Sequence, residues 1–175
     1  GQNIAMGQSA GRYFSSATSD SVVIGGSAGA GSSTTDFGGS SVVAVGGNAL
    51  QDLVSGSYTI AIGRNAFSNT ISGQASIAIG GNTGQNALNL QDCVFIGTSA
   101  GKGAGGGASA GIKSNYDVAI GYQAMSATTT SDNMVVIGMQ AGENVSTGAS
   151  SVIVGKDAGR AFYTTTNSVL IGYSA

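Results

Sequence analysis

Hydrophobic residues occur in short runs that repeat along the whole chain. Each run reads apolar, any residue, apolar, Gly, as in Ile60-Ala61-Ile62-Gly63, and Ala follows three residues later in every repeat except at Thr83. The glycines of the ten runs are separated by 18, 21, 17, 17, 17, 24, 17, 17 and 17 residues. A fixed period indicates a repeat architecture in which each unit stacks on its neighbours. The sequence therefore predicts an all-β chain of about ten 17-residue coils, forming a single repeat domain over residues 1–175.

The run before each Gly predicts a short strand, whose alternate side chains point to opposite faces. The residues three and one before Gly share a face and are Ile or Val in every repeat except at Met6. We expect these residues to stack inside a parallel β-solenoid. The predicted solenoid core is represented by Ile4, Ile24, Val45, Ile62, Ile79, Ile96, Ile120, Ile137, Val154 and Ile171.

The middle residue of each run is also apolar in every repeat. A strand that is apolar on both faces is buried on both, yet a single solenoid has only one interior. The predicted outer column must therefore be covered, and three copies around an axis would cover it. A dimer, or a covering element outside this chain, is the alternative. The predicted trimer interface consists of Ala5, Val23, Ala44, Ala61, Ala78, Phe95, Ala119, Val136, Ile153 and Leu170.

The residues between these runs predict turns and a weaker second strand. The Gly after each run predicts a corner with positive φ, and apolar residues at Val54, Ile71, Leu88 and Tyr163 indicate the second strand. The two longest spacings mark insertions at about 30–40 and 101–115. Insertions in solenoids often carry binding, and loop growth without function is the alternative. The candidate receptor contacts are Asp36, Phe37, Lys102 and Lys113.

Segments such as Ser76-Ile77-Ala78-Ile79-Gly80 and Asp117-Val118-Ala119-Ile120-Gly121 resemble the head repeats of YadA-like trimeric autotransporter adhesins. The resemblance covers the whole chain and implies a left-handed parallel β-roll that is homotrimeric. Those heads use shorter coils, and the 17-residue coil here is more similar to repeats of bacteriophage tail fibre proteins, as in Val169-Leu170-Ile171-Gly172-Tyr173. Handedness and trimerisation are implied by this resemblance and not by the period alone.

Composition narrows the function classes. Only 8% of the residues are charged and the net charge is -2, so the clustered Lys and Arg of nucleic-acid or anionic-membrane binding are missing. No apolar run is long enough to span a membrane. The chain has no His, which excludes Ser-His-Asp catalysis and His metal ligation. The lone Cys93 excludes an internal disulfide, and we interpret it as a small apolar residue.

Two sequence patterns resemble ligand-binding sites but lack the context that such sites need. Residues 101–106 match G-x-G-x-x-G, but no helix signal follows, so no dinucleotide site is predicted. Asp92, Asp117 and Asp132 fall near the strand entrance of three successive coils and could align around Ca²⁺, although Asp at a turn ordinarily bonds its own backbone. We therefore expect no catalytic residue, no metal and no cofactor.

These observations favour a non-enzymatic segment of a longer trimeric extracellular fibre. The first hypothesis is a bacteriophage tail fibre on the virion surface that contacts a host cell-surface glycan or protein. A bacterial adhesin head on the cell surface is the alternative, and a fibre-borne glycan depolymerase is a third. The expected partners are other copies of the chain and the host receptor, without nucleic acid and without membrane insertion.

Overall fold

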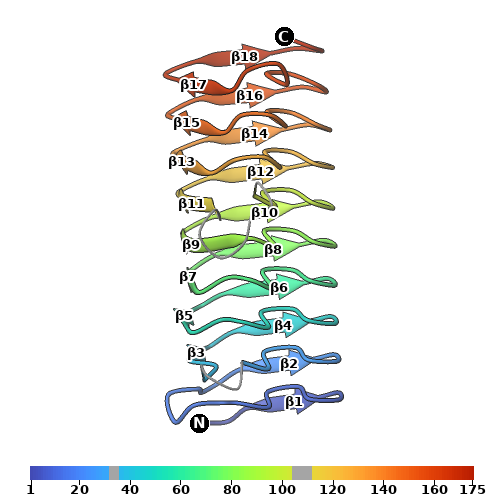
Figure 1. Cartoon of the computed structure of the whole chain (residues 1–175), viewed down its shortest axis with the longest axis vertical. Helices are drawn as coiled ribbons and strands as arrows, with labels where there is room; N and C mark the ends of the chain where they lie inside the picture. The colour runs from blue at the N-terminus through green and yellow to red at the C-terminus, as the bar shows by residue number, and fades with distance from the viewer. Residues whose placement is uncertain (32–35, 104–111) are drawn as a thin grey trace.

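The computed structural model describes residues 1–31, 36–103 and 112–175, which form strands and turns without a helix. The chain winds into a parallel β-solenoid of about nine turns, with the termini at opposite ends of the stack (Figure 1). The predicted class and the 17-residue period are confirmed, and the architecture is consistent with a β-roll. The sequence predicts about ten coils. The first sheet has ten strands, and the chain makes about nine turns between the first strand and the last.

All ten predicted strands form one parallel sheet in which each strand pairs with the equivalent strand of the next coil. The pairing is aligned residue for residue, so that Ile60 lies beside Ile77 and Ala61 beside Ala78. The strands are β1 (Ile4–Met6), β2 (Val22–Ile24), β4 (Val43–Val45), β6 (Ile60–Ile62), β8 (Ile77–Ile79), β10 (Val94–Ile96), β12 (Val118–Ile120), β14 (Val135–Ile137), β16 (Val152–Val154) and β18 (Val169–Ile171).

A second parallel sheet of eight strands forms the other strand layer of the coil. The predicted second strand is present, although Val54, Ile71 and Tyr163 directly precede their strands and only Leu88 lies within one. These strands consist mainly of Ser, Thr and Gly. They are β3 (Gly39–Ser40), β5 (Ser55–Ser57), β7 (Ser72–Gln74), β9 (Ala87–Gln91), β11 (Ile112–Asn115), β13 (Thr130–Asp132), β15 (Thr147–Ala149) and β17 (Thr164–Thr166).

The Gly that follows each strand of the ten-stranded sheet is required twice over. Gly80 has a φ of +133°, a conformation that L side chains rarely adopt. A Cβ atom on Gly80 would also lie 2.7 Å from the carbonyl carbon of Gly97 in the next coil. The predicted corner glycine therefore both turns the chain and lets neighbouring coils approach closely.

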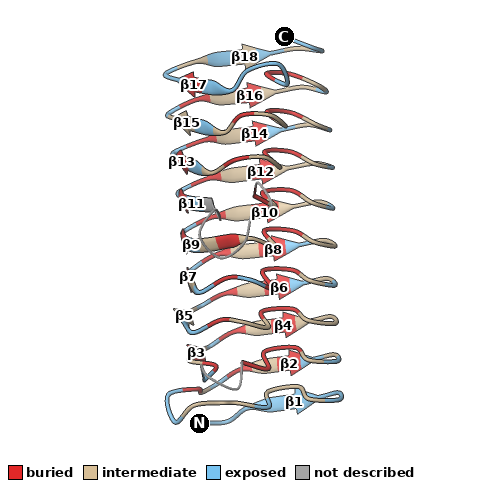
Figure 2. Cartoon of the chain, in the orientation of Figure 1, coloured by how far each residue is buried: buried red, intermediate tan, exposed pale blue. Residues whose placement is uncertain are grey.

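The interior column is the reverse of the predicted one. The middle residues of the strands point into the solenoid, and from Val23 to Ile153 they are 0% exposed (Figure 2). At the two ends of the stack, Ala5 and Leu170 pair in register with this column but are less covered. Because the column faces the core, the trimer-interface prediction is wrong for Ala5, Val23, Ala44, Ala61, Ala78, Phe95, Ala119, Val136, Ile153 and Leu170. The core prediction is equally wrong, because the flanking column faces outward at Ile4, Ile24, Val45, Ile62, Ile79, Ile96, Ile120, Ile137, Val154 and Ile171.

The reversal has a physical reason. Alternation along a strand separates two faces but does not say which one lies inside. The residue three after the corner Gly shares this interior, and it is a buried Ala in most coils, as at Ala66 and Ala100, so the space inside the coil is narrow. Small middle residues such as Ala61 fit this space, whereas two β-branched columns per strand would overfill it.

In most coils one of two positions supplies a large side chain to the interior. On the coils of Ala44, Ala61 and Ala119 the residue four after the corner Gly is large and 0% exposed, as Phe67 is beside Ala61, whereas the coil of Ala78 has Gly84 there. Where the middle residue is large, as at Phe95, that position is Gly101, whose Cβ would lie 2.7 Å from the Phe95 ring. Both Phe67 and Gly101 have positive φ, of 50° and 55°, so backbone shape does not dictate the choice. Packing density does.

Candidate interaction surfaces

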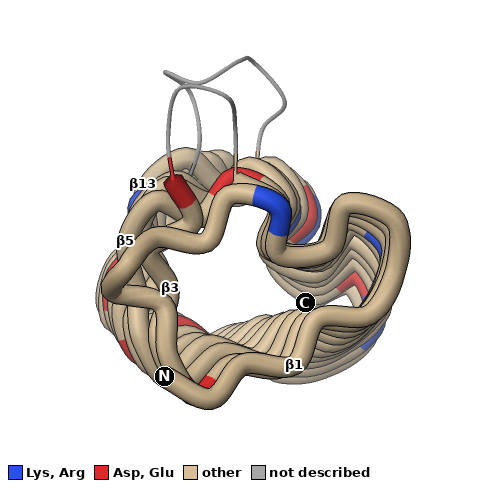
Figure 3. The backbone as a smooth tube through the Cα atoms, turned by 90° about the horizontal axis from the view of Figure 1, so that it is seen from below, with Lys and Arg blue, Asp and Glu red and all other residues tan. Residues whose placement is uncertain are grey.

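The outward side of the ten-stranded sheet is a continuous hydrophobic surface, which we call the apolar face. It consists of the first and third residue of each strand, and every one of these is Val, Ile or Met. The in-register pairing stacks them into two ladders. None of these strand residues is charged, and the charged segments nearest to them lie at the ends of the sheet (Figure 3).

Residues of the apolar face shield one another only in part. Within the stack, Ile24, Ile62, Ile79 and Ile137 are 37%, 39%, 38% and 37% exposed. Soluble monomers rarely expose contiguous apolar patches of more than a few hundred Å², and larger ones mark interaction sites. The sequence reasoning was correct that both sides of these strands are apolar and wrong about which side lies outside.

The outward side of the eight-stranded sheet is hydrophilic, and we call it the polar face. Its side chains are the first and third residues of the three-residue strands, such as Gln74 on β7 and Thr130 and Asp132 on β13. Register aligns Ser72 with Asn89 and Gln74 with Gln91. Exposed polar residues alternate with buried residues along these strands, as in a sheet with one face in water. The polar face therefore needs no second protein surface packed against it.

The predicted receptor residues are not equivalent in the structure. Phe37 is 0% exposed and its ring centroid lies 5.4 Å from that of Phe14, so its predicted receptor contact is wrong. Asp36 and Lys113 are exposed, and Lys102 is partly buried. Much of both insertions, including residues 104–106 of the G-x-G-x-x-G pattern, lies outside the described residues.

The three carboxylates considered for Ca²⁺ occupy different environments. Asp92 is exposed at a turn with positive φ, Asp132 is exposed at the end of β13, and Asp117 is 0% exposed. Within the described residues, no three His, Cys, Asp or Glu side chains gather in a group that could hold a metal ion. The arrangement therefore gives no support to a Ca²⁺ site formed by these three carboxylates.

Asp117 is the unexpected polar group of the interior. Its Oδ2 accepts a hydrogen bond from the Ser131 hydroxyl at 2.5 Å, and its Oδ1 accepts one from the Met134 backbone N–H at 2.7 Å. The Ser131 and Ser114 hydroxyl oxygens lie 2.9 Å apart. Burial raises the pKa of Asp117 above its usual value, against the lowering effect of these hydrogen bonds. Only its position before the strand, shared with Ser76 and Cys93, could have revealed it.

Cys93 lies in the same inward column and is fully buried. Its Sγ donates to the Gln91 and Ser114 carbonyl oxygens at 3.3 Å each. Burial raises the pKa of the thiol to about 12. The thiolate is the reactive form of Cys, so this residue acts as the predicted small core residue.

No family model, no curated protein and no solved structure matches this chain. In the part of the chain that the structure describes, no helix is long and apolar enough to cross a membrane. The fold therefore defines the class by itself: the chain is a parallel β-solenoid repeat protein.

Proposed function

We propose that this chain is a structural segment of a homotrimeric extracellular fibre, in which three copies bury their apolar faces against one another. The observation that carries the proposal is the uninterrupted ladder of Val and Ile on the outside of the ten-stranded sheet. Burying apolar area contributes about 25 cal/mol per Å², and no charge on this face opposes it. Three copies and a left-handed β-roll follow from the resemblance to YadA-like heads.

A second copy of the chain fits this face better than an unrelated partner does. The ladder repeats at the spacing of stacked strands, about 4.8 Å, over all ten strands. A partner that matches it along its length needs the same rise, which another solenoid of this sequence has. The interface would then stiffen the rod without any chemical activity.

The 17-residue coil favours a bacteriophage tail fibre on the virion surface. Such a fibre would contact a glycan or protein on the host surface. Asp36 and Lys113 are exposed polar residues within the two insertions and are the described positions that fit that role best. The fibre proposal does not depend on which receptor is bound.

The test compares one substitution on each face. Ile79→Asp places a carboxylate on the apolar face in every copy, whereas Gln74→Asp, in the preceding strand β7, places one on the polar face. Native mass spectrometry should give three times the 16.9-kDa chain mass for the wild type and for Gln74→Asp. Ile79→Asp should give the single-chain mass with an unchanged β circular dichroism spectrum. A folded wild-type monomer at micromolar concentration would contradict the proposal.

A further inference from the structure

The polar face changes in composition at its centre. On the outer strands β3, β5, β15 and β17, the residues that point outward are Ser, Thr or Ala. On the four strands between them, six outward residues have longer polar side chains, and all six are exposed. We call these six the amide patch: Gln74, Asn89, Gln91, Lys113, Asn115 and Asp132.

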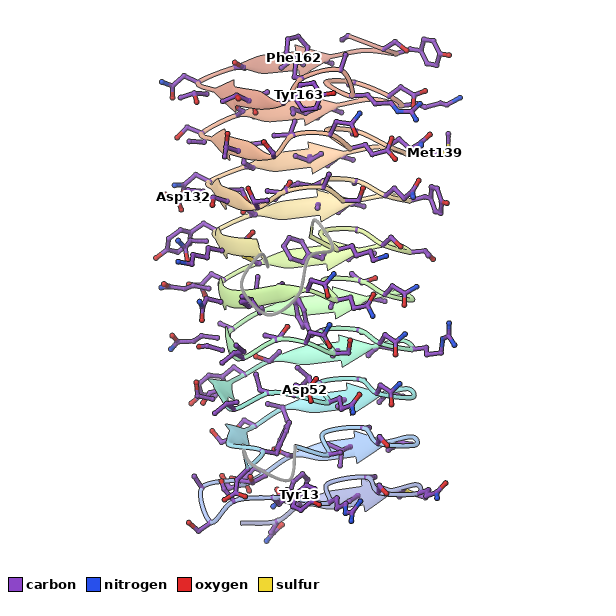
Figure 4. All side chains as sticks on the ribbon, in the orientation of Figure 1. Tyr13, Asp52, Asp132, Met139, Phe162 and Tyr163 are labelled. Carbon is purple, nitrogen blue, oxygen red and sulfur yellow. The ribbon has the colours of Figure 1, made fainter. Side chains whose placement is uncertain are left out.

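Strand pairing holds the amide patch together. One column contains Asn89 and Lys113, and the next contains Gln74, Gln91, Asn115 and Asp132. Successive coils are about 4.8 Å apart, so an extended ligand that follows the stack reaches several of these side chains. The labelled side chain of Asp132 lies at the outer margin of the solenoid, on the side opposite Met139 (Figure 4).

An aromatic ring borders the amide patch. Tyr116 directly follows Asn115 in the chain and is 51% exposed. Its hydroxyl oxygen accepts a hydrogen bond from Gln91 Nε2 at 3.0 Å. This bond holds the phenol group against the patch, while half of the residue stays accessible to a ligand.

The repeat itself does not require this surface. Tyr58 occupies the position of Tyr116 on another coil and is 69% exposed. It follows Ser57, however, and Ser40 takes the place of Gln91 in the coil before it. Short side chains therefore satisfy the fold at these positions. A local departure that neither burial nor strand pairing demands indicates a recognition site added to the fold.

The chemistry of the amide patch fits a neutral sugar. Each Asn or Gln amide offers an acceptor oxygen and two donor hydrogens, and a sugar hydroxyl both donates and accepts. Lys113 and Asp132 are the charged members of the six, and their charges cancel. Nucleic acid requires clustered cations, and a stable protein interface requires an apolar core that these six side chains lack. The Tyr116 ring adds an apolar surface with a polar edge, against which the C–H groups of a sugar ring can pack.

We propose that the amide patch and Tyr116 form a binding site for a neutral glycan of the host surface. The inference rests on the host contact proposed for the fibre, and it gives that contact a place and a ligand class. The site belongs to the sheet of β5 and β13, which lies on a different side of the coil from β1 and the apolar face (Figure 3). Association through the apolar face therefore leaves the site open, and three copies present three sites whose weak contacts add up.

Binding to a glycan array tests the site. The probes are immobilised oligosaccharides of bacterial and animal surfaces, both neutral and acidic, each measured at low and at high salt. The wild type should bind a subset of the neutral glycans, and salt should change that binding little because no net charge is involved. Tyr116→Ala and Gln91→Ala should each weaken it about tenfold, the loss expected for a side chain at the centre of a contact.

Tyr58→Ala and Ser57→Ala are the matched controls, because they change the equivalent positions outside the amide patch. Both should bind as the wild type does. Ala suits the backbone at the position of Tyr116, since Ala75 occupies it on another coil with a φ of 48°, where Tyr116 has 58°. Circular dichroism should therefore show an unchanged fold for all four variants.

Three results would overturn the inference: no binding to any neutral glycan, binding to acidic glycans alone that disappears at high salt, or equal losses from Tyr58→Ala and Tyr116→Ala. The native mass separates this inference from the fibre proposal. A trimer that binds no neutral glycan contradicts the glycan site and leaves the fibre proposal intact. A monomer whose glycan binding depends on Tyr116 contradicts the trimer and leaves the glycan site in place.

Discussion

At the scale of single residues, Asp117 shows how a solenoid interior accommodates a carboxyl group. Its two oxygens accept hydrogen bonds from Ser131 and Met134, and no Lys or Arg pairs with it among the described salt bridges. Burial raises the pKa of Asp117, and the charge of Asp132 raises it further. The buried Cys93 is the other titratable group that interacts with Asp117. A carboxyl group in this setting favours its protonated form.

Asp117→Asn is therefore expected to stabilise the protein at neutral pH. A carboxyl whose folded pKa is raised contributes stability below its unfolded pKa of 3.8 and loses it as pH rises through the folded value. The amide keeps an oxygen for the Met134 N–H and carries no charge. Denaturant melts should show a gain in unfolding free energy at pH 7 that shrinks toward pH 4.

Asp132→Asn is the matched control for that measurement, because Asp132 lies on the same coil and is exposed. It should change stability little at either pH. If Asp117→Asn were less stable than the wild type at pH 7, the hydrogen bonds would be holding the ionised carboxylate and the proposed direction would be wrong.

At the scale of the coil, two positions share one interior space: the middle residue of the strand and the residue four after the corner Gly. Phe95→Ala should cost about 3–5 kcal/mol of unfolding free energy, because it leaves a cavity in the stack. Adding Gly101→Phe copies the arrangement of Ala61 with Phe67, at a backbone φ of 55° where Phe67 has 50°. The double variant should regain about half of the loss.

Chemical denaturation followed by circular dichroism measures both values. Gly101→Phe alone is the control, and it should destabilise the protein because the two rings would compete for one space. Equal losses for Phe95→Ala and the double variant would show that the two positions do not share a volume.

The sequence was sufficient to predict the elements but not their orientation. The 17-residue spacing and the Val-Ala-Ile type runs identified all ten strands of the first sheet and the corner glycines. The direction in which the chain turns after each strand decides which side of the strand lies inside. The residue types within the strand, such as Ala78 and Ile79, do not determine that direction. The pairing of Phe95 with Gly101 links positions six residues apart and is visible only after Ala78 and its neighbours are placed inside.

The same limit affected the candidate sites. Phe37 lies in the first insertion, which predicted exposure, but its ring packs against Phe14 in the core. The sequence predicts a turn position for both Asp92 and Asp117. Asp92 occupies it, two residues before its strand, whereas Asp117 directly precedes its strand and points inward. Sequence periodicity counts residues along the coil, whereas burial depends on which neighbouring coil fills the space beside each one.

At the scale of the whole molecule, the solenoid is a sum of neighbouring coils, yet the coils are not all interchangeable. The rings of Phe67 and Phe95 lie two coils apart with centroids separated by 6.2 Å. Both extend into the coil between them, where a Cβ on Gly84 would clash with the Phe67 ring and lie 3.3 Å from that of Phe95. That coil serves as the shared space of two others.

Excising whole repeats turns this feature into a rule for editing the length of the protein. Removing residues 136–152 takes out one period and joins Val135 to Ile153, leaving neighbours of similar bulk in contact, so thermal unfolding should move by only a few degrees. Removing residues 78–94 also takes out one period, but it forces two phenyl groups into a single vacancy and should lower the melting temperature far more. Equal melting temperatures would mean that any coil can be removed without loss. Unequal ones would mean that a few coils are indispensable and the others are replaceable.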